Sequence, residues 1–390
     1  MASPAATALL RSLDDPSLLK SQALVGGEWV DADDGRVLHV LDKATHERVG
    51  SVPDMGGAET RRAAAAAAAA WRAWADVGGE ARGAVLRRWH ELLLAHEADL
   101  ARILTAESGK PLAESASELR YGASFVSWFA EEARRAYGEW IPADSPDTQI
   151  VVVREPIGVV AAITPWNFPI AMTTRKLAPA LAVGCPVVVK PADLTPLSCL
   201  ALVELACRAG VPPGVLSAVT ASAARAAEVG EAMCDDEHVR KLTFTGSTAV
   251  GKRLMARAAG TVKKVALELG GNAPLLVFED ADLDVAVRGT MASKFRNAGQ
   301  TCVCANRILV HEAVYEAFAE RLTTAVAALR VGRGTDPGVE IGPLVGARAV
   351  AKVEAHVHDA VAKGATVLCG GARRGDLGPH FYAPTVLAGA

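Results

Sequence analysis

From Pro156 onward, short apolar runs alternate with segments that carry helix signals, and this alternation constrains the fold more than any other feature of the chain. The expected strands are 158–163, 186–190, 214–219, 242–245 and 262–267. The expected helices between them are 169–182, 195–210, 223–233 and 248–259. This alternation predicts an α/β fold with a parallel, doubly wound sheet. Ligands bind such sheets at the carboxyl ends of the strands.

Helical segments are also expected on either side of this region. The stretch 58–74 contains an unbroken alanine run, and alanine has the highest helix propensity. The regions 83–107 and 115–137 are likewise expected to be helical. A later helix shows apolar residues on one face, namely Leu283, Ala286, Val287, Met291 and Phe295. It is expected to deliver residues 297–302 as a loop from a rigid base.

Composition excludes several classes of protein. The chain has 390 residues, of which 51% are hydrophobic, so it is long enough for two or more cores. Its 41 basic and 44 acidic residues give no electrostatic reason to expect a nucleic acid or membrane partner. The first 20 residues hold Asp14, Asp15 and two basic residues and lack the apolar block of a secretory signal, so a cytoplasmic location is expected, with the mitochondrial matrix as the alternative.

Seven cysteines without C-x-x-C spacing suit a reducing compartment and predict no metal site. Cys302 is the most informative of them, because it lies in the segment Asn-Ala-Gly-Gln-Thr-Cys-Val-Cys at 297–304. A thiolate is an effective nucleophile, and a loop cysteine is compatible with that role. The alternative is a small buried hydrophobic residue, which is the commoner fate of a free cysteine.

Two further residues complete a set suited to acyl chemistry. Apolar residues at 265, 267 and 269 share one face of the expected strand, and Glu268 points to the opposite face. A carboxylate there can activate water. The alternative is a solvated strand glutamate. Asn167 follows a strand at the mouth of a helix, where its amide can face a developing oxyanion. The alternative is an ordinary helix N-cap before Pro169.

Two strand ends carry residues suited to a dinucleotide. Gly246 and Ser247 lie between a strand and a helix, where glycine lets a pyrophosphate approach the helix N-terminus. Lys190 and Asp193 follow another strand. A carboxylate at position 193 can accept hydrogen bonds from ribose hydroxyls and would repel a 2′-phosphate, which favours NAD over NADP.

Together these motifs resemble the aldehyde dehydrogenase superfamily, and most closely its succinate-semialdehyde dehydrogenases. The resemblance covers residues from about 22 to 387. It rests on the order of the motifs and on the segments 107–111, 129–132, 165–169, 174–176, 293–297 and 301–306. It implies an NAD(P)-binding domain at 1–140 and 153–268, a bridging or oligomerisation strand segment at 141–152, and a catalytic α/β domain at 269–390.

The resemblance also implies a mechanism. The Cys302 thiolate attacks the aldehyde to form a thiohemiacetal, whose oxyanion is held by Asn167 and the Cys302 backbone N–H. After oxidation to a thioester, Glu268 activates the hydrolytic water. The cofactor, NAD or NADP, is expected to contact eight residues, seven in the first domain and one at the start of the second: Thr164, Pro165, Trp166, Lys190, Asp193, Gly246, Ser247 and Leu269.

The resemblance places two arginines at the distal carboxylate of the aldehyde. These are Arg175, on the helix after Asn167, and Arg296, six residues before Cys302. A guanidinium group binds a carboxylate in bidentate fashion. The alternative is a surface charge, or for Arg296 a helix-end cation. Cys304 suggests a redox switch in which peroxide joins it reversibly to Cys302.

The expected reaction is therefore oxidation of succinate semialdehyde to succinate in 4-aminobutyrate degradation. Glutarate semialdehyde or a related ω-carboxy aldehyde is an alternative substrate. The family forms homodimers and homotetramers. Its members continue past position 390 with a Glu-Glu-x-Phe-Gly-Pro segment, a substrate-binding serine and a strand that joins the partner subunit. The catalytic domain is accordingly expected to be truncated at its C-terminus, and a non-catalytic remnant is the alternative from another class.

Overall fold

The computed structural model describes residues 3–390, and its largest sheet has seven strands in the order β11-β10-β7-β8-β9-β1-β2. The first five strands are parallel to one another, and β1 and β2 extend the sheet in antiparallel fashion. The strands are β7 (Val159–Ile163), β8 (Val187–Lys190), β9 (Leu216–Ala218), β10 (Val239–Thr245), β11 (Lys264–Glu268), β1 (Ala23–Val25) and β2 (Glu28–Val30). The predicted parallel, doubly wound sheet is confirmed.

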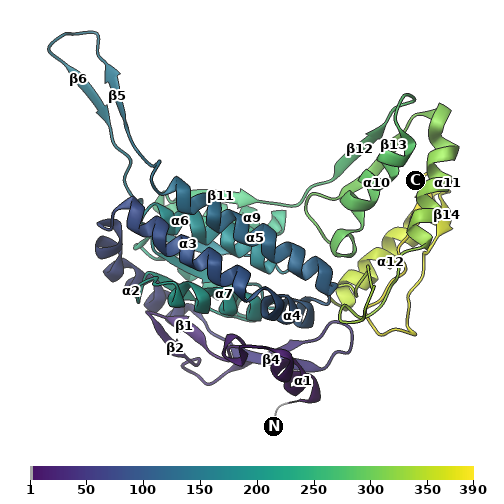
Figure 1. Cartoon of the computed structure of the whole chain (residues 1–390), viewed down its shortest axis with the longest axis horizontal. Coiled ribbons are helices and arrows are strands. Elements are labelled where there is room, and N and C mark those ends of the chain that lie inside the picture. The colour runs from purple at the N-terminus through teal and green to yellow at the C-terminus, as the bar shows by residue number, and fades with distance from the viewer. Residues whose placement is uncertain (1–2) are drawn as a thin grey trace.

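Helices bury this sheet on both faces (Figure 1). Val160 and Ala162 of β7 enter one core, whereas Val159 and Ala161 enter the other, because successive side chains of a strand point to opposite faces. The first core includes α3 (Gly79–Ala95), α4 (Glu97–Ser108), α5 (Leu112–Glu132), α6 (Pro169–Ala182) and α7 (Pro196–Arg208). The second includes α2 (Gly57–Ala75), α8 (Ala226–Asp235) and α9 (Thr248–Ala258).

The region 83–107 is helical, as predicted, and two helices occupy it. The helix α3 ends at Ala95 and α4 starts at Glu97, with His96 outside the helical region of backbone angles. Apolar residues recur on both sides of this break, so hydrophobic periodicity alone does not reveal it. The local signal is acidic: Glu97 and Asp99 lie in the first turn of α4, where a helix favours negative charge.

An antiparallel hairpin projects away from the body of the molecule (Figure 1). It consists of β5 (Glu139–Pro142) and β6 (Gln149–Val152), and every residue in both strands is exposed. Trp140 pairs with Val151, and Ile141 pairs with Ile150. The hairpin therefore presents apolar side chains to solvent. Two strands near the N-terminus, β3 (Val37–Leu41) and β4 (Arg48–Pro53), form a separate antiparallel pair beside α1 (Pro4–Ser12).

The C-terminal elements have a core of their own, at the far right in Figure 1. Parallel strands β12 (Ala273–Val277) and β13 (Ala305–Val310) pack with α10 (Leu283–Lys294) and α11 (Tyr315–Ala327). The pair β14 (Thr366–Cys369) and β15 (Val386–Ala388) and the helix α12 (Ala347–Ala362) follow. The predicted helix before the cysteine loop is confirmed, and Asp282 caps it by accepting from two backbone N–H groups. Within residues 3–390, no helix is long and apolar enough to cross a membrane.

Candidate active site

The strand order creates a switch point beside β7. From β7 the chain passes to β8 and β9 on one side, and then crosses to β10 and β11 on the other side. Ile163, the last residue of β7, is paired with Lys190 of β8 and with Phe244 of β10. Ligands bind open α/β sheets at such a crossing, outside the carboxyl ends of the strands. The predicted cofactor segments 164–166, 190–193, 246–247 and 269 lie at the carboxyl ends of β7, β8, β10 and β11, respectively.

Unpaired polar atoms lie at this edge of the sheet. The buried hydroxyl groups of Thr164 and Thr245 have no hydrogen-bond partner within the described chain. The segment Gly246–Ser247 then leads into the N-terminus of α9, which carries partial positive charge. The Leu269 side chain packs against Gly251 in this first turn. A Cβ atom added at Gly251 would lie only 2.6 Å from a methyl carbon of Leu269. The residues at this edge fit an anionic dinucleotide.

Lys190 lies beneath the same edge and is buried. Its ammonium group donates to the carbonyl of Pro191 at 3.0 Å. Burial lowers the pKa of Lys190, and the charges of Asp193 and Asp54 oppose this effect. A second buried lysine, Lys43, donates to the carbonyl of Leu194 at 3.2 Å, next to Asp193. No sequence motif points to Lys43, because only the fold brings it to this loop.

Asn167 is tied to the cysteine loop. Its side-chain amide donates to the carbonyl of Gln300 at 3.0 Å, although the two residues are 133 positions apart. The N-cap interpretation of Asn167 is wrong, because the helix α6 begins at Pro169 with Phe168 as its N-cap residue. One N–H of the amide group is used by Gln300, which leaves the other free to face an oxyanion.

Cys302 is exposed in the loop between α10 and β13. The interpretation of this residue as a buried hydrophobic side chain is therefore wrong. Its loop begins with a short turn, η3 (Arg296–Gly299). Gly271, three residues after Glu268, lies close to this loop. A Cβ atom added at Gly271 would be 3.4 Å from the carbonyl oxygen of Cys302. The segments of Asn167, Glu268 and Cys302 are thus brought together.

Cys304 differs from Cys302 in burial. Its side chain is 1% exposed, and its thiol contacts the Thr301 hydroxyl group. It also approaches the carbonyl oxygens of Gly299 and Lys294 at 3.4 and 3.5 Å. All seven cysteines are free thiols, and a bond between Cys302 and Cys304 would require the Cys304 thiol to leave these partners.

Glu268 is exposed at the end of β11, and a buried lysine lies near it. Lys176 donates to the Thr243 hydroxyl group at 2.8 Å. Burial lowers the pKa of Lys176 to about 8, and the charge of Glu268 acts in the opposite direction. Lys176 is a site residue that the sequence motifs do not predict. The available signal was a lysine in a helix whose other residues are almost all small or apolar.

The two predicted substrate arginines contact aromatic rings. Arg175 donates to the Tyr121 hydroxyl group at 2.5 Å and stacks over Phe125 at 4.7 Å. Its Nε atom is buried and has no hydrogen-bond partner in the described chain. Arg296 stacks over the ring of Phe168 at 4.9 Å. The rings hold both guanidinium groups in place, but the structure shows no contact between the two arginines.

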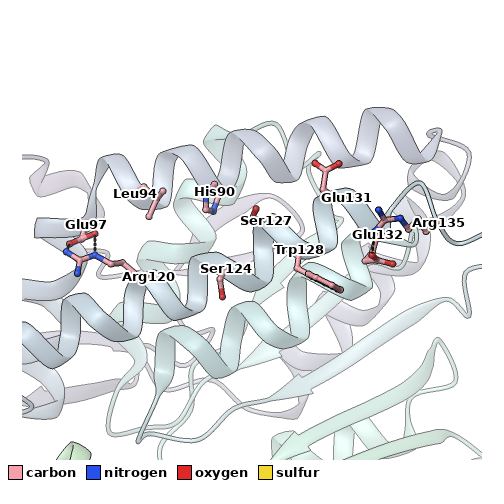
Figure 2. A pocket seen from close by; sticks show the side chains of 10 residues that line it. All are labelled: His90, Leu94, Glu97, Arg120, Ser124, Ser127, Trp128, Glu131, Glu132 and Arg135. Carbon is pink, nitrogen blue, oxygen red and sulfur yellow. Dashed lines mark hydrogen bonds and ion pairs between the residues drawn. The ribbon is translucent and has the colours of Figure 1, made fainter. Parts of the chain in front are cut away.

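A groove of about 820 Å³ runs along α3 and α5, away from these residues (Figure 2). Ion pairs join Glu97 to Arg120 and Glu132 to Arg135 on its walls. None of the predicted site residues lines the groove. A second cavity of about 750 Å³ lies at the base of the hairpin and also lacks them.

Comparison with known proteins bears on this site. The profile described as "Aldehyde dehydrogenase family" matches residues 29–390. Glutarate-semialdehyde dehydrogenase of Pseudomonas putida is 56% identical over 96% of this chain and 77% of its own length. Succinate-semialdehyde dehydrogenase [NADP(+)] of Escherichia coli is 54% identical over the same shares.

Structural comparison agrees with the sequence comparison. The crystal structure of succinate-semialdehyde dehydrogenase from Burkholderia pseudomallei is 57% identical, with a TM-score of 0.95 over 97% of this chain and 78% of that one. The chain thus spans about three quarters of the length of these relatives. The residues matched by the family profile include Cys302, Glu268 and Asn167, and they span both the large sheet and the C-terminal elements. The chain belongs to the aldehyde dehydrogenase family.

Proposed function

We propose that this protein oxidises succinate semialdehyde to succinate, as in 4-aminobutyrate degradation, with NAD or NADP as the electron acceptor. The observation that carries the proposal is the hydrogen bond from the Asn167 amide to the loop of the exposed Cys302. This bond joins an oxyanion donor to a nucleophile across the two halves of the fold. Glutarate semialdehyde is the second candidate, since relatives are named for each of the two substrates.

In the proposed mechanism, the Cys302 thiolate forms a bond to the aldehyde carbon, and the carbonyl oxygen becomes the oxyanion of a thiohemiacetal. The remaining N–H of the Asn167 amide and the Cys302 backbone N–H stabilise this charge. The bound cofactor supplies the oxidation that converts the thiohemiacetal to a thioester. Glu268 then takes a proton from water as the water attacks the thioester, and the Cys302 thiolate is released.

The cofactor would bind along the carboxyl edge of the sheet. Eight residues are proposed to hold it: Thr164, Pro165, Trp166, Lys190, Asp193, Gly246, Ser247 and Leu269. The unpaired hydroxyl groups of Thr164 and Thr245 support this placement. The carboxylate of Asp193 favours NAD, whereas the Escherichia coli relative is named for NADP.

The substrate would place its distal carboxylate between Arg175 and Arg296. The unpaired buried Nε atom of Arg175 supports this assignment, because a buried guanidinium N–H requires an acceptor.

The proposed cofactor-binding domain comprises residues 1–140 and 153–268, and the proposed catalytic domain comprises residues 269–390. The segment 141–152 lies in the exposed hairpin and is proposed to join a second subunit. The seven free thiols support a reducing compartment, the cytoplasm or the mitochondrial matrix.

The test is reduction of NAD and NADP, followed by absorbance, with succinate semialdehyde, glutarate semialdehyde and butanal as a neutral control. We expect turnover with both carboxylated aldehydes and much slower turnover with butanal. Cys302→Ser should reduce kcat by at least about a thousandfold, since it removes the nucleophile. The buried Cys199→Ser serves as its matched control. A folded protein that reduces neither cofactor with any aldehyde would support the non-catalytic alternative.

A further inference from the structure

One face of the helix α5 lies between the two halves of the site. Glu114 and Glu118 are four residues apart, so they lie one above the other on this face. Lys110 precedes the helix by two positions. None of these three residues belongs to the proposed catalytic or cofactor-binding set. Their contacts run to the two loops that carry Asn167 and Cys302.

Glu118 and Lys110 hold the loop of Asn167. One carboxylate oxygen of Glu118 accepts from the backbone N–H groups of Ile170 and Ala171 at 2.9 and 3.3 Å. This contact caps α6, whose own N-cap residue supplies no side-chain bond. The other oxygen pairs with Lys110, and both side chains are 1% exposed. Lys110 in turn donates to the backbone carbonyl of Asn167 at 2.8 Å.

Glu114 holds the loop of Cys302. Its two carboxylate oxygens accept from the backbone N–H of Asn297 at 3.0 and 3.1 Å. Asn297 has φ 52° and ψ 40°, a left-handed conformation that costs energy for a residue other than glycine. The Asn297 side chain donates to the carbonyls of Asn167 and Gln300 at 3.2 and 3.3 Å. Glu114 thereby stabilises a strained turn that touches both loops.

Energetic considerations favour a role other than general stability. A fully buried ion pair such as that of Lys110 and Glu118 loses much of its Coulombic gain to desolvation, and apolar replacements are often as stable. Burial also raises the pKa of Glu114, which is a cost of keeping a carboxylate in this position. Lys110, Glu114 and Glu118 each hold a backbone atom of the Asn167 loop or the Cys302 loop in place by a hydrogen bond. Their contribution is therefore to the geometry of the site.

We propose that Lys110 and Glu114 are positioning residues that hold the Asn167 amide and the Cys302 loop in their reactive arrangement. This inference rests on the proposed function, because it gives the geometry its purpose. Lys110 acts on the Asn167 carbonyl, and Glu114 acts on the N–H of Asn297. Both act through other residues and touch no substrate.

The experiment compares Glu114→Ala, Glu114→Gln and Lys110→Met with the parent. The control is Glu131→Ala, which alters an exposed glutamate on the same helix. Per folded molecule, Glu114→Ala and Lys110→Met should each lower kcat about 10- to 100-fold and leave the KM for the cofactor within about twofold, because small displacements of reacting groups have effects of this size. Glu114→Gln should recover most of the loss, since its amide oxygen still accepts from Asn297.

Amide hydrogen exchange provides a readout that needs no aldehyde. Exchange in the peptide that covers 299–304 should be faster in Glu114→Ala than in the parent, although among residues 3–390 the Glu114 carboxylate accepts from Asn297 and from no residue of that peptide. If Glu114→Ala fails to fold, Glu114→Asp tests the same link. It keeps the charge but withdraws the carboxylate from the Asn297 N–H by one carbon, so it should lower kcat and speed exchange at 299–304 in a folded protein.

The outcomes separate the two claims. Parent-like kcat and parent-like exchange at 299–304 in folded Glu114→Ala and Lys110→Met would overturn the positioning role. The same conclusion follows if Glu114→Gln is as impaired as Glu114→Ala, or if Glu131→Ala shows the same defects. A parent that turns over no aldehyde would instead overturn the proposed function, and the exchange measurement would still decide whether Glu114 orders the loop.

Discussion

At the level of single side chains, burial separates Cys302 from the other cysteines. Burial raises the pKa of Cys199 to about 12 and those of Cys207 and Cys234 to about 11. A thiol that stays protonated at neutral pH is a poor nucleophile and oxidises slowly. Cys302 is the exposed member of the seven. Any thiol chemistry at neutral pH is therefore expected at this residue first.

The redox hypothesis is tested with Cys304→Ser. If peroxide joins Cys302 to Cys304, the parent should lose activity with peroxide and recover it with dithiothreitol. The variant should recover less activity, because its Cys302 sulfenic acid has no neighbouring thiol to trap it as a disulfide and excess peroxide carries it on to the sulfinic acid, which dithiothreitol does not reduce. Activity after each treatment is the measurement. Equal loss and equal recovery in both proteins would rule out the switch.

Substitution of the arginines tests the substrate class. Arg175→Ala and Arg296→Ala should each lower kcat/KM for succinate semialdehyde about 10- to 100-fold, the size expected when one hydrogen bond to a charged group is lost. Neither should change kcat/KM for butanal by more than about threefold, since butanal has no carboxylate. Steady-state kinetics with both aldehydes provide the comparison, and equal losses for both would refute carboxylate recognition.

At the level of elements, helix α7 depends on a residue of another helix. The buried carboxylate of Glu107, near the end of α4, accepts from the backbone N–H groups of Leu197 and Ser198 at 2.7 and 2.9 Å. These groups lie in the first turn of α7, and the side chain of the N-cap residue Thr195 makes no capping hydrogen bond to them. The anchor of α7 therefore lies about 90 residues away in the sequence.

Glu107 should make stability depend on pH. Burial raises the pKa of Glu107 from 4.5 to about 7. The folded state therefore binds more protons than the unfolded state between about pH 4.5 and 7, and the free energy of unfolding falls as pH rises through this range. The loss amounts to about 3 kcal/mol at most.

The measurement is urea unfolding at several pH values between 4.5 and 8. Glu107→Gln does not titrate, so its unfolding midpoint should fall less than that of the parent as pH rises. Glu131→Gln, on an exposed residue, should follow the parent. Parallel curves for the parent and Glu107→Gln would contradict the assignment.

At the level of the whole molecule, the exposed hairpin is the clearest candidate for subunit contact. The side chains of Trp140 and Val151 are 68% and 58% exposed and pair across the hairpin. Exposed apolar surface of this kind marks interaction sites. An unpaired strand edge can also add a strand from another chain.

We expect the parent to assemble into a multiple of its 40.5 kDa mass through this hairpin. The double substitution Trp140→Lys with Val151→Lys should shift the assembly toward the monomer, because it places charge in the apolar contact. Multi-angle light scattering after size-exclusion chromatography measures the mass. Val37→Lys, at another exposed apolar position, is the control. A parent that elutes as a monomer, or a double variant with unchanged mass, would contradict this expectation.

Much of the fold follows from local sequence patterns. The predicted helix at 169–182 and the parallel sheet are confirmed, because periodicity, caps and strand-length apolar runs are properties of neighbouring residues. The break at His96 cannot be predicted in this way, since the same apolar period continues across it. Cys302 and Asn167 could be proposed from their motifs because each lies at the end of a predicted element.

The amino-acid sequence by itself thus determined the α/β class, the order of the strands along the chain and the candidate nucleophile. The tertiary structure decided which distant groups meet: Asn167 with Gln300, Glu114 with Asn297, and Lys176 near Glu268. The physical reason is that helix caps and strand periods depend on residues within a few positions. Buried charges and loop contacts depend instead on how the packed cores bring together segments that lie about 90 to 180 residues apart in the sequence.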